Sequence, residues 1–498
     1  MKKCNLLLSS LLLACMLLAS CGESAGGSSS PTGETAQNPS ATEAEETAEP
    51  SYLDGFSDLD FGGAEVKVIA LSVPGANPSI SLEDNTGERI FDQQYMRDRE
   101  TEDLLNIAIS YTETGNEVGQ RTELADKLQK AVIAGDCPWS FMINSIAFGM
   151  GPISSSGVLL DMTALPHFSP TQPWWSANLY SNMSYKGHIF FDGGPISLAY
   201  YYSPCILAYN QLLAENFGIG DIYAMVEDGK WTIDVFNTMA DGIAVDLDGN
   251  GKMTEDDQFG LATDELSAQS FYIGIGGRFD EVVDGIPTIV AGSEKNLDLL
   301  QKAADVISIK ERTLNTEQLS GASFTEKKTR TFKAGRSLFL AYNMSGLIDQ
   351  LRDMENDYGI IPLPKYDEAQ ENYLTYGSPF GPVGVCVPVT NTAEQNEIAG
   401  AAIETMAYLS YTEVQPLMYE ITLKEKVSRD ERSKDMLDII YTDVIYDWTS
   451  SIDPGGLNVL TRALILGSKK DPVSSYAKIE AKAVAALQAV LDAYESNM

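Results

Sequence analysis

Residues 246–260 read DLDGNGKMTEDDQFG and carry oxygen-bearing side chains at the spacing of a calcium-binding loop. Such a loop needs side-chain oxygens at positions 1, 3 and 5, a glycine at position 6, a backbone carbonyl at position 7 and a carboxylate at position 12. Counting from the first aspartate, this stretch supplies all of these groups. We therefore predict a structural Ca²⁺ site whose ligands are Asp246, Asp248, Asn250, Lys252 and Asp257.

Position 12 departs from the usual loop, which has a glutamate that binds through both oxygens. Asp257 is one methylene shorter, so it would bind calcium through one oxygen or through a water molecule. An acidic turn that holds no metal is the alternative. Calcium sensors pair two loops to expose an apolar groove, and the sequence has no second match. We interpret the loop as a structural calcium site rather than a calcium sensor.

Signatures of catalysis are scarce in this chain. The two histidines, His167 and His188, stand in no metal-binding spacing, so both are expected to be packing or surface residues. The sequence has no GxSxG motif and no phosphate-binding loop. A glycosidase needs only two carboxylates, and the 71 acidic residues supply many pairs. A surface glycoside hydrolase therefore stays open as an alternative function.

Aromatic residues near expected turns and strand ends form a second group that could bind a ligand. Sugar rings present apolar faces that stack on aromatic rings, while amide and carboxylate side chains bind their hydroxyls. Packing in the core is the alternative interpretation of each ring. The aromatic residues in question are PWW at 173–175, YYY at 200–202, Tyr342, Tyr376, Phe380 and Trp448.

The N-terminus reads MKKCNLLLSSLLLACMLLASC, with a basic start and a short apolar stretch. The apolar residues 6–19 are too few to span a bilayer comfortably, so residues 1–20 are predicted to be a secretory signal peptide. Residues 18–21, LASC, resemble a bacterial lipobox, in which the cysteine is acylated and becomes the new N-terminus. We predict lipidation of Cys21 by palmitate and an extracytoplasmic location at the membrane surface. A plain signal peptide with a chance cysteine is the alternative.

Charge and cysteine content limit the partners of the chain. The formal net charge of −37 repels phosphate backbones, so nucleic acid is not expected as a partner. If Cys21 is lipidated, Cys137, Cys205 and Cys386 remain, and an odd number gives no disulfide framework. We favour buried free thiols over a bridge between the last two. The sequence has no further apolar run of membrane-spanning length, so only the lipid would hold the protein to the membrane.

Beyond the signal, residues 21–62 are rich in Gly, Ser, Thr, Pro and Glu and are predicted to be a disordered tether. From Glu65 onward, short apolar runs alternate with segments of helical periodicity, which is the pattern of parallel α/β sheets. We predict strands at 66–71, 107–113, 138–145, 337–342 and 358–364, and helices at 91–106, 118–134, 294–307 and 325–333.

Local signals predict where several helices begin. Thr392 with Gln395, and Ser428 with Glu431, have the spacing of capping boxes. Ser345 is expected to cap the helix that follows strand 337–342. One closing helix is predicted to bury an apolar stripe that consists of Tyr476, Ile479, Val484, Leu487, Leu491 and Tyr494.

Seven stretches follow one another along most of the mature chain: AGDCPWSFM (134–142), GVLLDMTALP (157–166), YKGHIFF (185–191), SPCILAYNQLLAENFGI (203–219), GKWTIDVF (229–236), FKAGRSLFLAY (332–342) and YGIIPLPKYDEAQENY (358–373). In this order they resemble the extracellular solute-binding protein family 1, the lipoprotein receptors of carbohydrate ABC importers. Two positions depart from the family pattern, since Ser140 replaces an aspartate and Gln211 a lysine.

The resemblance implies an α/β fold of two lobes, the type II periplasmic-binding-protein arrangement, with the ligand in the cleft between them. It implies a monomeric receptor without catalysis, which captures a sugar or oligosaccharide by lobe closure and delivers it to an ABC permease. A receptor for peptides or other solutes is a further alternative. The implied parts are a first lobe at 63–196 and about 378–427, a second lobe at 197–377, and a C-terminal helical segment at 428–498 that packs across the lobes.

The resemblance also implies ligand-binding residues. Ligands of open α/β sheets bind at the carboxyl ends of the strands, so the turns after strands 138–145 and 337–342 would contact the sugar. Aromatic side chains near the segments that cross between lobes would stack on it. The implied residues are Asn144, Ser145, Tyr201, Tyr342, Asn343, Ser345, Tyr376 and Phe380.

Overall fold

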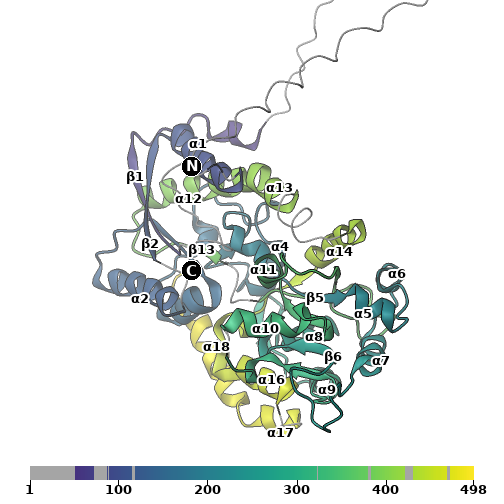
Figure 1. Cartoon of the computed structure of the whole chain (residues 1–498). Coiled ribbons are helices and arrows are strands. Elements are labelled where there is room, and N and C mark those ends of the chain that lie inside the picture. The colour runs from purple at the N-terminus through teal and green to yellow at the C-terminus, as the bar shows by residue number, and fades with distance from the viewer. Residues whose placement is uncertain are drawn as a thin grey trace, which may run out of the picture. The chain divides into compact units, whose positions relative to one another are not determined.

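Two five-stranded sheets form the framework of the chain in its computed structural model (Figure 1). Contacts group Tyr52–Met498 into one unit. The predicted sites Cys21 and Phe380 lie outside the residues that the structure describes. Those residues are 51–71, 87, 89–114, 118–321, 323–378, 383–420, 430–467 and 471–498.

The first sheet has the strand order β2-β1-β3-β13-β4. Strand β1 is parallel to its neighbours β2 and β3, whereas β13 is antiparallel to β3 and β4. Val66, Val68 and Ile69 are fully buried because helices cover the sheet. We call the elements packed on this sheet the first lobe. Its main elements are β1 (Ala64–Leu71), α1 (Arg89–Leu105), β2 (Ile107–Thr114), α2 (Val118–Ala134), β3 (Phe141–Ser145), β4 (Asp192–Gly193), β13 (Val383–Cys386) and α12 (Ala393–Leu409).

The second sheet has the order β11-β5-β10-β6-β9 and forms the second lobe. Strand β6 is parallel to β9 and β10, and β5 is antiparallel to β10 and β11, so the carboxyl ends of four strands lie at the edge where β5 begins. Trp231, Phe236 and Phe339 pack together in its core. The elements are β5 (Cys205–Asn210), α7 (Ile233–Ile243), β6 (Phe259–Thr263), α8 (Glu265–Gly274), α9 (Glu294–Ile307), β9 (Thr313–Asn315), α10 (Phe324–Lys333), β10 (Ser337–Asn343), α11 (Met344–Gln350) and β11 (Tyr358–Ile361).

Within the described residues, hydrogen bonds join three segments that lie between the two sheets: the first crossing contains Ser203, the second Gly377 and the third Ile445. Ser378 N donates to Ser203 O at 3.1 Å, and Gly377 N donates to Ile445 O at 2.9 Å. The hydroxyls of Ser203 and Tyr446 lie 2.6 Å apart. The second and third crossings also pair as the parallel strands β12 (Thr375–Tyr376) and β14 (Val444–Ile445). The sequence analysis missed the third crossing.

The C-terminal helices contact both lobes. Helix α14 (Glu431–Thr442) packs against β11, and α16 (Leu457–Leu466) packs against α8 and α9, whereas α18 (Glu480–Glu495) contacts η3 (Ser154–Ser156) of the first lobe. Figure 1 shows α16 and α17 (Pro472–Ala477) beside α9. Within the described ranges, no helix has both the length and the apolar character needed to cross a bilayer.

Shorter elements connect these helices and strands. They are η1 (Tyr52–Phe56), η2 (Ile146–Met150), α3 (Gly151–Ile153), η4 (Met162–Ala164), α4 (Ala177–Met183), η5 (Leu198–Tyr202), α5 (Gln211–Asn216), α6 (Ile222–Glu227), β7 (Asp280–Val283), β8 (Ile286–Ile289), η6 (Thr316–Gln318), η7 (Ser410–Val414), α13 (Gln415–Leu417), α15 (Trp448–Ile452) and η9 (Pro454–Gly456).

Most predicted elements are present, and three helix predictions need correction. The capping box of Thr392 and Gln395 is confirmed. Helix α11 is capped by Asn343, and Ser345 lies inside it. Helix α14 is capped by Asp430 rather than Ser428, which lies outside the described residues.

The closing helix and the tether also differ from expectation. The predicted closing helix is two helices, α17 and α18, and Val484 is exposed rather than buried. Residues 52–56 were expected in the disordered tether, but they form η1 with Phe56 buried. The ring of Tyr52 lies 4.5 Å from that of Trp174, which explains why this part of the chain is ordered. Cys205 and Cys386 are buried free thiols, as favoured.

Candidate functional site

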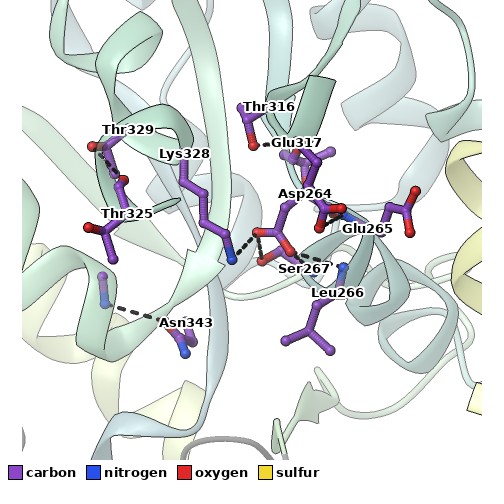
Figure 2. A network of polar contacts seen from close by, with 12 residues as sticks. Asp264, Glu265, Leu266, Ser267, Thr316, Glu317, Thr325, Lys328, Thr329 and Asn343 are labelled. Atoms are coloured by element: carbon purple, nitrogen blue, oxygen red, sulfur yellow. Dashed lines mark hydrogen bonds and ion pairs between the residues drawn. The ribbon is translucent and has the colours of Figure 1, made fainter. Parts of the chain in front are cut away.

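The carboxyl-end edge of the second sheet holds a buried ion pair. Asp264 follows β6 and caps α8, where its carboxylate accepts hydrogen bonds from Leu266 N at 2.9 Å and Ser267 N at 3.1 Å. Lys328 of α10 places its Nζ 3.1 Å from Asp264 Oδ2, and the two side chains are 6% and 1% exposed. Figure 2 shows the lysine reaching across to the carboxylate, where the Ser267 hydroxyl donates to the same oxygen, Asp264 Oδ2, at 2.7 Å. The pair puts both signs of charge at the edge where ligands of α/β sheets bind.

Two further groups shape the electrostatics of this edge. Lys328 Nζ lies 4.9 Å from the ring centroid of Tyr342, a cation–π contact that also supports the ammonium. Glu317 lies near Asp264 and Glu265, and burial first, then these two acids, raise the pKa of Glu317. The edge can therefore offer charged and neutral hydrogen-bonding groups to a polar solute.

The predicted residues Tyr342, Asn343 and Ser345 all lie at this edge. Tyr342 is 6% exposed and packs under the lysine. Asn343 Oδ1 accepts hydrogen bonds from Gly346 N at 3.3 Å and Ser345 Oγ at 3.0 Å, which fixes the amide orientation. The three residues therefore position one another around the start of α11.

The predicted first-lobe residues Asn144 and Ser145 end β3, and both are fully buried. Asn144 Nδ2 donates to Arg121 O at 2.9 Å, and its Oδ1 accepts from Ser145 N at 2.7 Å. Ser145 Oγ accepts from Phe148 N at 3.4 Å and caps η2. Both side chains hold the turn after β3 in place. Within the described ranges, no hydrogen bond joins them to Asn343 across the lobes.

Tyr376 lies among buried polar atoms that lack hydrogen-bond partners. It is fully buried on the second crossing, and its hydroxyl donates to Ser450 Oγ at 3.1 Å. Helix α8 contacts both β12 and α16, and α15 contacts α16. Polar atoms on or next to these elements that have no partner within the described chain are Gln269 Oε1 and Nε2, Thr375 Oγ1, Ser378 Oγ, Asp447 Oδ2 and Trp448 Nε1.

An unpaired buried polar atom costs about 1–3 kcal/mol, so such a cluster calls for ordered water or a polar ligand. The sequence analysis did not single out Gln269. The available signal was a carboxamide inside an otherwise apolar helix, in SAQSFYIG. That signal is weak, because most such residues face solvent or a neighbouring helix.

Two carboxylates meet at the start of α15 beside this polar cluster. Asp280 of β7 accepts from Trp448 N at 3.1 Å and from Thr449 N at 2.7 Å, and Asp447 Oδ1 accepts from Ser450 N at 2.5 Å. Burial, then the Asp447 charge, raise the pKa of Asp280 to about 8. Burial also raises the pKa of Asp447. The pair therefore retains a proton at neutral pH.

The predicted calcium loop folds back on itself. Ligand oxygens of Asp246, Asp248 and Asp257 lie within 4.8 Å of one another. The Asp246 carboxylate accepts from Gly251 N at 2.6 Å, and Gly251 has a φ of +79°, a conformation that favours glycine at this turn. Asp257 accepts from Leu247 N at 2.9 Å, which holds the end of the loop against its beginning. The donor set fits a hard divalent cation.

Comparisons with known proteins bear on the fold. No protein-family model matches the chain, and no curated protein matches it. Among solved structures, a cyclic α-maltosyl-1,6-maltose binding protein from Arthrobacter globiformis is 16% identical and has a TM-score of 0.54 over 87% of this chain and 99% of its own. This chain has the fold of the ABC-transporter solute-binding proteins.

Two more solved solute-binding proteins show the same likeness. An ABC substrate-binding protein from Listeria monocytogenes in complex with cycloalternan is 14% identical, with a TM-score of 0.53 over 86% of this chain and 99% of its own. A solute-binding protein from Thermotoga lettingae bound with α-D-tagatose is 13% identical, with a TM-score of 0.52 over 86% and 100%. The predicted two-lobed α/β fold class is thus confirmed.

Proposed function

We propose that the protein is a receptor of an ABC importer, which captures a sugar or oligosaccharide between its lobes and delivers it to a permease. The observation that carries this proposal is the set of unpaired buried polar atoms around Tyr376. These atoms lie between a second-lobe helix and the crossing segments, where a solute's hydroxyls would satisfy them. The fold and the ion pair of Asp264 and Lys328 at the neighbouring edge support the same assignment.

The mechanism follows from the crossing segments. The solute first binds to one lobe, and closure about the hydrogen-bonded crossings then buries it. Closure brings the first-lobe turn after β3 toward the second-lobe edge at Asn343. No covalent chemistry is required, because binding to both lobes is enough to favour the closed state.

A thermal-shift screen of residues 52–498 against mono- and oligosaccharides tests this function. A sugar at about a hundred times its dissociation constant adds roughly 2.7 kcal/mol to stability and should raise the melting temperature by a degree or more. A selective shift, with intact sugar recovered afterwards, is the expected result. If no sugar shifts the melting temperature, the sugar assignment is wrong and peptides and other solutes become the next candidates.

A glycoside hydrolase is the rival function, and the buried carboxyl pair of Asp280 and Asp447 is the observation that could favour it. The two residues are 4% and 2% exposed, and backbone amides occupy three of their four oxygens. Such carboxylates are poorly placed to reach a glycosidic bond. Shortened oligosaccharides after incubation would nevertheless establish the enzyme and overturn the receptor.

Lipid anchoring through Cys21 is part of the proposal. The lipobox-like residues 18–21 support it, and the acyl chain would hold the receptor beside its permease. Replacing Cys21 with serine should move the protein from the membrane fraction to the soluble fraction of expressing cells. Retention of Cys21→Ser in the membrane fraction would contradict the anchor.

We further propose that the loop from Asp246 to Asp257 holds a structural Ca²⁺. The converging carboxylates support this site, and Asp257 would bind through one oxygen because backbone amides occupy part of its carboxylate. The ion would stabilise the connection from α7 to β6 without contacting the solute.

A further inference from the structure

The hairpin formed by β7 and β8 is rooted in the second lobe. Phe279 precedes β7 and is buried in the second-lobe core, where its ring centroid lies 4.9 Å from that of Tyr272 on α8. The backbone nitrogen of Arg278 donates to Asn296 Oδ1 on α9 at 3.0 Å. Helices α8 and α9 therefore fix the point from which the hairpin projects.

The base of this hairpin is bonded to the first lobe. Asp280 is 4% exposed, and its carboxyl oxygens accept from Trp448 N at 3.1 Å and Thr449 N at 2.7 Å, the first two residues of α15. Trp448 is fully buried in the first-lobe core, with its ring centroid 5.6 Å from that of Tyr494. Helix α15 also contacts η2 and α3 of the first lobe. A second-lobe carboxyl group therefore binds a helix that packs on the first lobe.

The tip of the hairpin contacts a tight turn of the first lobe. Lys186 N donates to Gly285 O at 2.6 Å, and these two residues have φ values of +53° and +80°. Lys186 lies in the turn between the bridged residues Tyr185 and His188, and Gly285 lies in the turn between β7 and β8. The Lys186 ammonium pairs with Glu495 of α18 at 2.5 Å. Two turns from different lobes thus meet, and the C-terminal helix supports one of them.

Apolar contacts join the hairpin to both lobes between its base and its tip. Ile289, the last residue of β8, packs against the hydrophobic cores of both lobes. Helix α4 of the first lobe also contacts β7. The hairpin leaves the second lobe and returns to it, so it reaches across the lobe boundary without being one of the crossing segments.

Bonds across the boundary resist rotation of the lobes about the crossing segments. Because the root is fixed, such a rotation would have to pull Gly285 from Lys186 and shear Asp280 from α15. The tip is more exposed than the base, since Val283 and Ile286 are 46% and 43% exposed. Exposed hydrogen bonds open more readily than buried ones, so the tip should release before the base.

We propose that the β7–β8 hairpin is a clasp that restrains rotation of the two lobes about the crossing segments. While the tip and the base are both bonded, the lobes keep one relative arrangement. Release of the tip weakens the base, and the crossings can then bend. The clasp goes beyond the proposed receptor function, because the restraint lies in the protein itself and does not depend on which solute binds.

Hydrogen–deuterium exchange of the purified protein, at single-amide resolution and without sugar, tests the clasp. Gly285→Val strains the tip, where φ is +80°, and its Cβ would lie 3.4 Å from Lys186 Cα. The two amides at the start of α15 should then exchange about two- to tenfold faster, the factor for loss of one hydrogen bond. The amides of Gly377 and Ser378, which bond the crossings to one another, should accelerate by a similar factor.

Gly321→Val is the matched control, because Gly321 has a φ of +78° and a Cβ there meets nothing within 4 Å. It should leave exchange at the base and at the crossings unchanged. In every variant the amides of strand β1 should keep their wild-type rates, which excludes global unfolding as the cause. Asp280→Leu removes both acceptor oxygens at the base and should also speed exchange at Gly377 and Ser378.

The outcomes separate a clasp from a local contact. If Gly285→Val speeds exchange only at Lys186, or nowhere, the tip does not control the base and the clasp is wrong. Equal acceleration by Gly321→Val would assign the effect to backbone strain and would also contradict the clasp. Acceleration by Asp280→Leu that is confined to the start of α15 contradicts it too, and this variant decides the matter if Gly285→Val fails to fold. Because no solute is added, these results stand whether or not the protein binds sugar.

Discussion

Asp264 and Lys328 form an ion pair that the protein has almost wholly removed from water. Burying two charges costs more than their attraction returns unless other bonds help, and here Ser267 and Leu266 bind the same carboxylate. Replacing Lys328 with methionine should lower the free energy of unfolding by about 3–5 kcal/mol, because it leaves a buried negative charge unpaired. Urea unfolding followed by circular dichroism would measure the loss.

Lys302→Met is the control for that measurement. Lys302 pairs with Asp234 at the surface, where the side chains are 34% and 72% exposed. Exposed pairs contribute about 0–1 kcal/mol, so this variant should unfold near the wild-type midpoint. If both variants lose the same free energy of unfolding, burial of the Asp264–Lys328 pair does not explain its contribution to stability.

Some site residues could be predicted from the sequence and others could not. The convergence of the Asp246, Asp248 and Asp257 oxygens was predictable because local turns bring them together, such as the one at Gly251. The pairing of Asp264 with Lys328 was not, because it joins the ends of two elements far apart in the chain. The unpaired Gln269 was missed for the same reason, since its significance depends on which helices meet.

The junction between β7 and the start of α15 should make the protein's stability depend on pH. The pKa of Asp280 is raised to about 8 in the folded protein, and that of unfolded aspartate is about 3.9. The stabilising proton is therefore fully present below about pH 4 and is lost as pH rises through about 8. We expect this junction to lose stability over that range.

Asp447→Asn isolates the effect of the carboxyl pair. Asp447 Oδ1 accepts from Ser450 N, whereas its Oδ2 has no partner among the described residues, so an amide nitrogen fits there. The variant should become progressively more stable than the wild type as pH rises from about 5 to about 9. Urea unfolding at a series of pH values measures this difference. Parallel stability curves would mean that the charge of Asp447 does not raise the pKa of Asp280.

The calcium loop joins α7 to β6, so its ion should affect the second lobe's stability. Extracellular calcium modules bind with dissociation constants of about 10⁻⁴–10⁻³ M. At about 1 mM calcium, the tighter value adds roughly 1.4 kcal/mol, which corresponds to a few degrees of melting temperature. Chelation should remove this stabilisation and leave sugar affinity nearly unchanged.

Asp246→Asn tests that the loop is responsible. This variant should melt at nearly the same temperature with and without calcium, because it lacks the Asp246 carboxylate that would supply the first ligand position. A chelation effect that persists in the variant would place the ion elsewhere. Loss of sugar affinity on chelation, without loss of stability, would mean that calcium contacts the solute.

At the scale of the whole molecule, the sequence predicts more of the fold than of the hinge. Strand β1 (Ala64–Leu71) ends in a continuous buried apolar run, and helix α2 (Val118–Ala134) buries Leu124, Leu128 and Val132 at helical spacing. The alternation of such segments indicates parallel sheets. The third crossing contains a strand of only two residues, Val444–Ile445, which has no periodicity to detect. Its role depends on its pairing with Thr375–Tyr376.

The hinge packs the crossings so closely that one glycine should be essential to it. A Cβ at Gly377 would lie 2.4 Å from the ring of Tyr446, whose hydroxyl binds Ser203 on the first crossing. Gly377→Ala should therefore displace Tyr446 and cost about 1–3 kcal/mol of stability. If the proposed receptor function is right, sugar affinity should also fall, because the same movement would disturb the hinge about which the lobes are proposed to close. Thermal melting and calorimetry of the variant measure the two effects.

Gly119→Ala provides the comparison, because a Cβ there meets nothing within 4 Å and the residue lies in α2. Alanine favours the helix by about 0.5–1 kcal/mol over glycine, so this variant should be slightly more stable and bind sugar normally. If Gly377→Ala loses stability but keeps its affinity, the crossings hold the lobes together without controlling closure. If it loses both, stability and solute capture depend on the same packed hinge.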